Sequence, residues 1–151
     1  MTDALAPSRL APLRTCTCFN LRKASRAITQ LYDEFLRPVN LRATQFSLLG
    51  LLAQTGALRI TTLAEAAVMD RTTLKRNLDL LERDGLVRIQ PGADARVREV
   101  SLTPAARVRL LAALPLWEQA QAHLIGRLGP TRSQRLLADL SAAISAAHPD
   151  S

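Results

Sequence analysis

Residues 58–102 hold the pattern that most constrains the fold, because they place two short helices and a hairpin in direct succession. The first helix is expected over residues 62–67, with Thr62 as its N-cap, since Glu65 follows three residues later as in a capping box. Residues 69–70 then form a tight turn into a second, longer helix. This part of the chain is therefore expected to fold as packed helices with a small sheet attached.

The second helix is expected over residues 71–84, and it has two chemically different faces. Asp70 is its expected N-cap and Gly85 its expected stop. At roughly 100° per residue, three leucines fall in one narrow stripe that is expected to face the core: Leu74, Leu78 and Leu81. The outward face and its flanks carry hydroxyl and basic side chains: Arg71, Thr72, Thr73, Lys75 and Arg76. These side chains are candidates for phosphate and base contacts, and a solvated helix face is the alternative interpretation.

A β-hairpin follows the second helix. Alternating apolar residues predict strands over residues 86–90 and 96–102, and Pro91 with Gly92 opens the turn between them. Two helices joined by a tight turn and followed by such a hairpin predict a winged helix-turn-helix over about residues 44–102.

The tip of this hairpin is basic. Arg96 and Arg98 lie just past the turn, and Asp94 is expected to hold the Arg96 guanidinium in place. A protruding basic loop beside an exposed helix can reach the minor groove of DNA, whose negative potential attracts arginine. A solvated charge pair of little energetic value is the alternative interpretation.

The segments that flank this region carry apolar helical seams that the small central domain cannot cover. One lies within residues 16–38, and two more lie within residues 103–148, separated by Gly129-Pro130. Residues 1–15 lack periodicity and are expected to form a loose arm. Pairing with a second copy is the simplest way to bury such seams. We therefore expect one domain over residues 1–151, mainly α with a small β-wing, that forms a homodimer through its terminal helices.

The charge of the chain favours a polyanionic partner. The 151 residues have a net charge of +7 and a pI of about 10.9. Residues 71–98 hold seven Lys or Arg against four Asp or Glu, so only part of the excess lies there. Aromatic residues make up only 3% of the chain, which disfavours RNA binding because RNA-binding proteins stack bases on aromatic rings. Double-stranded DNA is the expected partner.

Other functional classes lack support in the sequence. The glycines form no phosphate loop and no nucleophile arrangement is recognisable, so neither an enzyme nor a cofactor is expected. His123 and His148 have no metal-site spacing. There is no membrane-length apolar run and no signal peptide. The two cysteines form no disulfide framework, so a cytoplasmic location is expected.

Three stretches of the chain resemble the MarR family of bacterial transcriptional regulators: LRATQFSLLGLL, TTLAEAAVMDRTTLKRNLDLLERDGLV and DARVREVSLTPAA. The last matches the family's wing pattern, and the resemblance covers roughly residues 16–147. It implies a triangular homodimer held by the first helix and the last two. It also implies recognition helices in successive major grooves of a pseudo-palindrome and wings in the flanking minor grooves. Family members are commonly repressors, often of neighbouring genes, and many lose DNA affinity when a small phenolic or anionic ligand binds.

The start of the first helix is also similar to the oxidant-sensing OhrR branch of that family. This resemblance makes Cys18 a candidate sensor and Tyr32 a match for one of the tyrosines expected near it, whereas Arg22 and Ala43 stand where other tyrosines are expected. Arg22 and the helix N-terminus would both favour a thiolate. Cys16 is a candidate resolving thiol, although cysteines so close in sequence form a strained ring. Two inert cysteines buried in the dimer seam are the alternative interpretation.

The sequence therefore predicts a DNA-binding transcriptional regulator, released from its operator by a small aromatic or anionic effector or by peroxide. A winged-helix module that binds protein instead of DNA is the alternative. In such a module the outward face of helix 71–84 would be apolar or acidic, whereas here it carries Thr72, Lys75 and Arg76.

Overall fold

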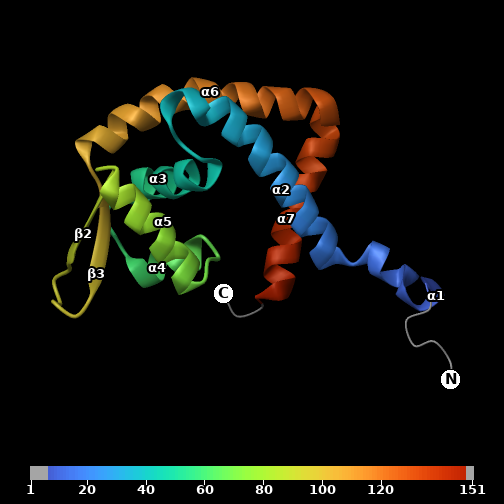
Figure 1. The fold of residues 1–151 in the computed structure, drawn as a ribbon, viewed down its shortest axis with the longest axis horizontal. Helices are drawn as coiled ribbons and strands as arrows, with labels where there is room; N and C mark the ends of the chain where they lie inside the picture. Colours follow the sequence, from blue (N-terminus) through green and yellow to red (C-terminus); the bar gives the residue numbers. More distant parts are fainter. Residues whose placement is uncertain (1–6, 149–151) are drawn as a thin grey trace.

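A computed structural model of the chain describes residues 7–148 and confirms a mainly helical fold with a small β-wing (Figure 1). The elements in chain order are α1 (Pro7–Leu10), η1 (Ala11–Thr15), α2 (Thr17–Leu36), η2 (Arg37–Val39), α3 (Ala43–Thr55), β1 (Leu58–Arg59), α4 (Ile60–Ala66), α5 (Arg71–Arg83), β2 (Val87–Pro91), β3 (Arg98–Leu102), α6 (Pro104–Leu128) and α7 (Pro130–Ala147). Among these described residues, no helix combines the length and the apolar character needed to cross a membrane.

The wing is a three-stranded antiparallel sheet in the order β1-β3-β2. Val100 at the centre of β3 pairs with Leu58 of β1 on one side and with Ile89 of β2 on the other. Val100 is fully buried, because this register places it over the helical core. The short strand β1 thus joins the helices to the hairpin, as a winged helix requires.

The core is made almost entirely of leucine and small aliphatic side chains. The largest fully buried side chains come from α2, α3, α4, α5, the start of the wing and β3: Leu36, Leu48, Leu49, Leu52, Leu63, Leu74, Leu78, Leu81, Leu86 and Val100. Phe46 of α3 and Trp117 of α6 stack beside this cluster with ring centroids 6.1 Å apart. The long helix α6 therefore packs on the helix-turn-helix region as well as extending beyond it.

The predicted cap of α5 is confirmed, and α6 has a side-chain cap of the same kind. Asp70 caps α5, and Thr103 caps α6 by accepting a hydrogen bond from the Ala106 amide at 3.2 Å. The predicted cap at Thr62 is wrong, because α4 already begins at Ile60 and Arg59 occupies the N-cap position. The physical reason is that β1 pairs with β3 up to Arg59, so the chain enters the helix as soon as the ladder ends.

The N-terminal segment differs from the loose arm expected over residues 1–15. Residues 1–6 of that arm lie outside the described residues. Residues 7–15 form the short helical elements α1 and η1, and their described side chains are exposed. Pro12 in the first turn of η1 explains how this short helix starts without apolar periodicity, because proline is preorganised for the first turn of a helix.

The side of the molecule away from the hairpin exposes much apolar surface. Figure 1 places the hairpin at one end and α1, the first half of α2 and α7 toward the other. Large apolar side chains on these elements and on the end of α6 remain exposed in the single chain: Leu10, Leu13, Phe19, Leu21, Ile125, Leu137 and Ile144. The seam predicted for the first helix is thus left uncovered over its N-terminal half.

The turn between α4 and α5 holds a valine in a backbone conformation that glycine normally adopts. Val68 has φ +49°, its amide donates to the Glu65 carbonyl at 3.0 Å, and the Met69 amide donates to the Ala64 carbonyl at 2.9 Å. This is the hydrogen-bond pattern of a Schellman C-cap. Helix α5 ends in the same way, with Gly85 at φ +69°. The Val68 side chain is 56% exposed, so little packing offsets the strain of its left-handed backbone.

Replacing Val68 by Gly is expected to stabilise the protein by about 1 kcal/mol, because glycine adopts this backbone conformation without steric cost. Urea unfolding at an unchanged m-value measures the effect. The matched variant Gly85→Ala is expected to destabilise the fold, and no atom within 4 Å of the added Cβ would contribute a clash. A Val68→Gly protein that unfolds at lower urea than the wild type would contradict this account.

Candidate nucleic-acid interface

Helix α5 presents its polar face to solvent because its apolar face is locked in the core. Leu74, Leu78 and Leu81 are at most 1% exposed, as the predicted stripe requires. On the opposite side, Thr72 and Arg76 are exposed, and in the described part of the chain Arg76 takes part in no ion pair. Arg76 is therefore free to meet an anionic or hydrogen-bond-accepting surface.

The N-terminus of α5 is held by a carboxylate cap. Asp70 Oδ1 accepts from the Thr73 amide at 2.9 Å, and Asp70 Oδ2 accepts from the Thr73 hydroxyl at 2.5 Å. These bonds, the hydroxyl bond first, lower the pKa of Asp70 below its usual 3.8. Thr73 was predicted as a DNA contact, and its hydroxyl proton is committed to this cap. Thr72 beside it makes no such side-chain bond among the described residues and stays exposed.

Lys75 is held by an acidic neighbour one turn along α5. Its Nζ lies 2.6 Å from Asp79 Oδ2, and both side chains are more than half exposed. The pair neutralises both charges locally, so Lys75 contributes less positive potential to this face than a free lysine would.

The wing tip carries the predicted arginines, but its acidic residue acts differently from the prediction. Arg96 and Arg98 are exposed, and Arg98 pairs with Pro91 across the hairpin. Asp94 Oδ1 accepts from the backbone amide of Arg96 at 2.9 Å. No ion pair in the described part of the chain joins Asp94 to the Arg96 guanidinium, so the predicted contact is not found. Asp94 shapes the turn, as short acidic side chains do in Asx turns, and leaves the Arg96 side chain free.

A groove of about 610 Å³ separates α5 from the wing. Its lining combines apolar side chains such as Ile60 and Ile89 with Arg71, Arg96 and Arg98. Arg59 also lines it, although the sequence reasoning missed this residue. Only the pairing of β1 with β3 brings Arg59 beside the wing, and no local pattern signals that pairing.

The predicted redox residues are not brought together within one chain. Cys18 is exposed in the first turn of α2, and Cys16 is half-buried at the N-cap position of that helix. Tyr32 lies fourteen residues beyond Cys18 on α2, roughly 21 Å along the axis. Its hydroxyl donates to Gln121 Oε1 of α6, and burial raises its pKa. Cys18 is exposed in the single chain, and the alternative of two cysteines buried in a dimer seam concerns the dimer and stays a prediction.

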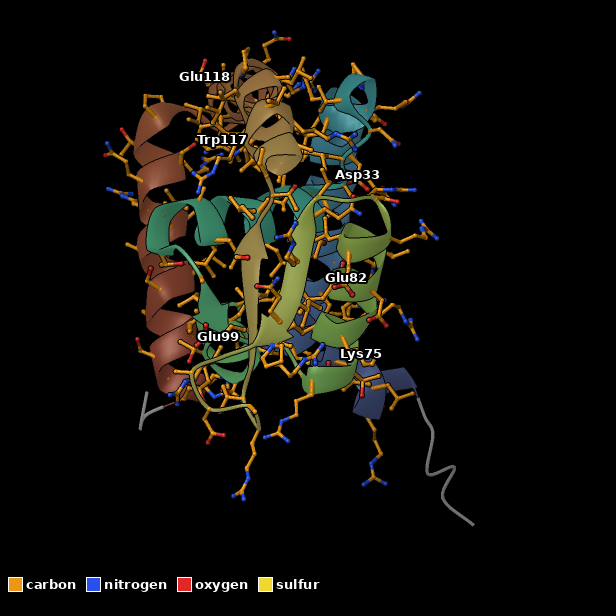
Figure 2. All side chains as sticks on the ribbon, turned by 90° about the vertical axis from the view of Figure 1, so that its left-hand side faces the viewer. Asp33, Lys75, Glu82, Glu99, Trp117 and Glu118 are labelled. Carbon is orange, nitrogen blue, oxygen red and sulfur yellow. The ribbon has the colours of Figure 1, made fainter. Side chains whose placement is uncertain are left out.

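The labelled side chains give the direction in which this face points. Figure 2 shows Lys75 toward the lower edge of the molecule, where the hairpin tip also lies, and Asp33 toward the upper part. The part of α5 that carries Lys75 and the hairpin tip therefore lie toward the same edge of the molecule. Across residues 7–148, no group of three or more His, Cys, Asp or Glu side chains is placed to hold a metal ion.

Comparison with known proteins finds a family match and solved structures with the same fold. The family model described as the MarR family matches residues 41–97, from the start of α3 to the wing tip. No relative was found among curated proteins. Among solved structures, the transcriptional regulator MosR from M. tuberculosis, in complex with DNA, is 41% identical with a TM-score of 0.76. The match covers 88% of this chain and 98% of that one.

Two further DNA complexes share the fold. The transcriptional repressor CouR bound to a 23-mer DNA duplex is 26% identical with a TM-score of 0.78, and the match covers 89% of this chain and 96% of that one. A mutant of MarR from E. coli complexed with operator DNA is 22% identical with a TM-score of 0.74, covering 89% and 93%. At that last identity the similarity concerns the fold alone.

The Asp70 cap leads to a pH prediction. Because its pKa is lowered in the folded state, the charged cap stabilises the protein above the usual value of 3.8, and this contribution is lost as the pH falls through the lower folded-state value. We expect the urea midpoint of wild type to exceed that of Asp70→Asn near neutral pH, and this gap to close between about pH 5 and pH 2. Glu65→Gln, on exposed α4 surface, is the control. A gap that stays constant with pH would contradict the charged cap.

Proposed function

Because this chain belongs to the MarR family of transcriptional regulators, we propose that it is a repressor that binds a pseudo-palindromic DNA operator as a homodimer. The observation that carries the proposal is the outward face of α5. Three buried leucines fix the orientation of the helix, and Thr72 and Arg76 project from the opposite side. A helix held in this way after a tight turn suits insertion into the major groove.

The residues on this face have two roles in binding: some contact bases and others contact phosphates. Arg76 donates two hydrogen bonds to a guanine edge, and Thr72 contacts a thymine methyl or a phosphate. Arg71, Thr73 and Lys75 lie along the phosphate backbone, which sets position without reading sequence. On the wing, Arg96 and Arg98 enter the adjacent minor groove, and Asp94 keeps the turn in shape for them.

A second copy of the chain completes the regulator. The apolar side chains exposed on α1, η1, α2 and α7 support pairing at the end away from the wing, because a soluble monomer rarely exposes so many large apolar groups together. A two-fold axis there presents two α5 helices to half-sites about one helical turn apart.

Release from DNA follows a change in the dimer. A small aromatic or anionic effector, or peroxide acting on Cys18, shifts the population toward a dimer whose α5 helices no longer match the half-sites. In the oxidative case the Cys18 thiolate attacks one peroxide oxygen. The O–O bond breaks, a sulfenic acid forms on sulfur and hydroxide leaves. Cys18 lies in the first turn of α2 and is exposed in the single chain.

An electrophoretic shift assay on the DNA upstream of the protein's own gene tests the proposal, together with selection of binding sites from random DNA. Steep loss of affinity with rising salt is expected, because phosphate contacts release counterions. A winged-helix module that binds protein would bind no preferred DNA sequence, and that outcome would overturn the proposed function.

Arg76→Ala is expected to lose about 1–3 kcal/mol of discrimination at one base pair of the selected operator, because the bidentate guanine contact disappears. Fluorescence anisotropy with operator variants measures this change. Arg96→Ala is the comparison variant, because minor-groove arginines read shape and potential: it should weaken binding to the same extent on these variants. Equal weakening on all sequences by Arg76→Ala would remove its base-reading role.

Cys18→Ser is expected to abolish any release from DNA by peroxide and to leave DNA affinity unchanged, because serine cannot form a sulfenic acid. The same anisotropy titration, with and without hydrogen peroxide, measures both quantities. Cys16→Ser is the matched control and should keep the response if Cys18 alone is the sensor. A peroxide response retained by Cys18→Ser would rule out this thiol.

A further inference from the structure

We propose that Asp33 is a positioning residue that fixes the angle between α2, which carries the dimer surface, and the DNA-binding region, and so determines which half-site spacing the dimer accepts. This inference rests on the proposed function, since spacing has meaning only for a dimer on a two-part operator. It concerns a side chain that makes no contact with the basic face itself: Asp33 and Lys75 lie well apart in Figure 2.

Helix α3 begins without a cap of its own. Arg42 occupies the N-cap position with an extended backbone, φ −94° and ψ 154°. An arginine side chain carries only donors, so it cannot accept hydrogen bonds from the first amides of the helix. Gln45 Oε1 accepts from the Arg42 amide at 2.9 Å, which satisfies a different group. The first turn of α3 therefore needs an acceptor from another element.

Asp33 supplies that acceptor from the last turns of α2. Its Oδ1 accepts from the Ala43 amide at 2.7 Å, and its Oδ2 accepts from Arg42 Nη1 at 3.0 Å. The Asp33 side chain is only 20% exposed, whereas that of Arg42 is 75% exposed. A carboxylate at a helix N-terminus also interacts favourably with the helix dipole. One partly buried side chain thus joins two helices through both of its oxygens.

The same part of α2 is fixed on its other side to α6. The Tyr32 hydroxyl donates to Gln121, and the Phe35 ring lies 5.8 Å from the His123 ring, centroid to centroid. Asp33 lies between these two residues in sequence and faces α3 instead. The direction of α2 relative to the DNA-binding region is therefore set by ties to α6 and to α3.

The C-terminal end of α5 lies beside this junction of α2 and α3, which we call the corner. Arg83 and Asp84 line one open cleft of about 670 Å³ together with Asp33 and Arg42. A change in how α2 meets α3 would therefore displace the region from which α5 extends toward DNA. In a dimer, the two copies of this corner determine the separation of the two α5 helices.

A stiff joint gives a bivalent protein one best spacing. When the joint loosens, the effective concentration of the second half-site falls at that spacing, while other spacings become accessible. Loss of Asp33 should therefore flatten the dependence of affinity on spacing. General loss of stability would instead lower affinity by the same factor at every spacing.

The experiment uses the full-length protein and an operator selected with the wild type from random DNA. Its half-sites are moved closer or further apart by one and two base pairs, and affinity is measured by anisotropy at each spacing. For Asp33→Ala we expect the affinity ratio between the best spacing and its neighbours to fall by about threefold or more. Glu34→Ala, the adjacent exposed carboxylate, should keep the wild-type profile.

Two further variants keep the test decisive. Arg42→Ala retains the bond from the Ala43 amide and should flatten the profile less than Asp33→Ala. Asp33→Asn keeps a neutral acceptor but loses the charge at the helix N-terminus and the ion pair with Arg42, so it should flatten the profile to a smaller but measurable extent. It replaces Asp33→Ala in the comparison if Asp33→Ala fails to fold by circular dichroism. Parallel profiles for wild type and the folded Asp33 variants would overturn the inference alone, since wild-type binding with a sharp optimum would leave the proposed function intact. A wild type that binds no DNA sequence preferentially would overturn both.

Discussion

Burial of one leucine stripe on α5 is the constraint on which the rest of the interface depends. Leu74, Leu78 and Leu81 leave almost no surface exposed, so the helix cannot rotate about its axis without opening the core. This fixed rotation decides that Thr72 and Arg76 face outward. Hydrophobic packing, which has no directional chemistry of its own, thus determines which polar groups are offered to a partner.

Several polar side chains on α5 already have hydrogen-bond or ion-pair partners within the chain. Asp70 and Thr73 satisfy the start of α5, and Lys75 is neutralised by Asp79. The basic character of the face therefore comes mainly from arginine, which stays charged and has donors in a fixed planar geometry. The wing is arranged in the same way: Asp94 accepts a hydrogen bond from the backbone, and the arginine side chains remain exposed to solvent.

The molecule combines this polar end with an apolar end that one chain cannot cover. Exposed leucine, isoleucine and phenylalanine side chains lie on α1, η1, the first half of α2, the end of α6 and α7. Figure 1 places these elements toward the end away from the hairpin. The two ends meet at the corner where Asp33 caps α3. Family membership and the relatives solved with DNA support a DNA-binding regulator, and the proposed pairing through the terminal helices rests on the division of surfaces.

Local patterns in the chain predict the long helices, the hairpin, the buried and exposed faces of α5 and the cap at Asp70. These features depend on side-chain periodicity and on hydrogen bonds that span three or four residues, so they follow from the order of residues. The start of α4, the position of Arg59 in the groove beside the wing and the hydrogen bond from Tyr32 to α6 depend on the tertiary fold. The cap that Asp33 provides to a helix ten residues away depends on it as well. The partner of a polar side chain depends on how the chain turns back on itself, and that path is set by the packing of the whole core.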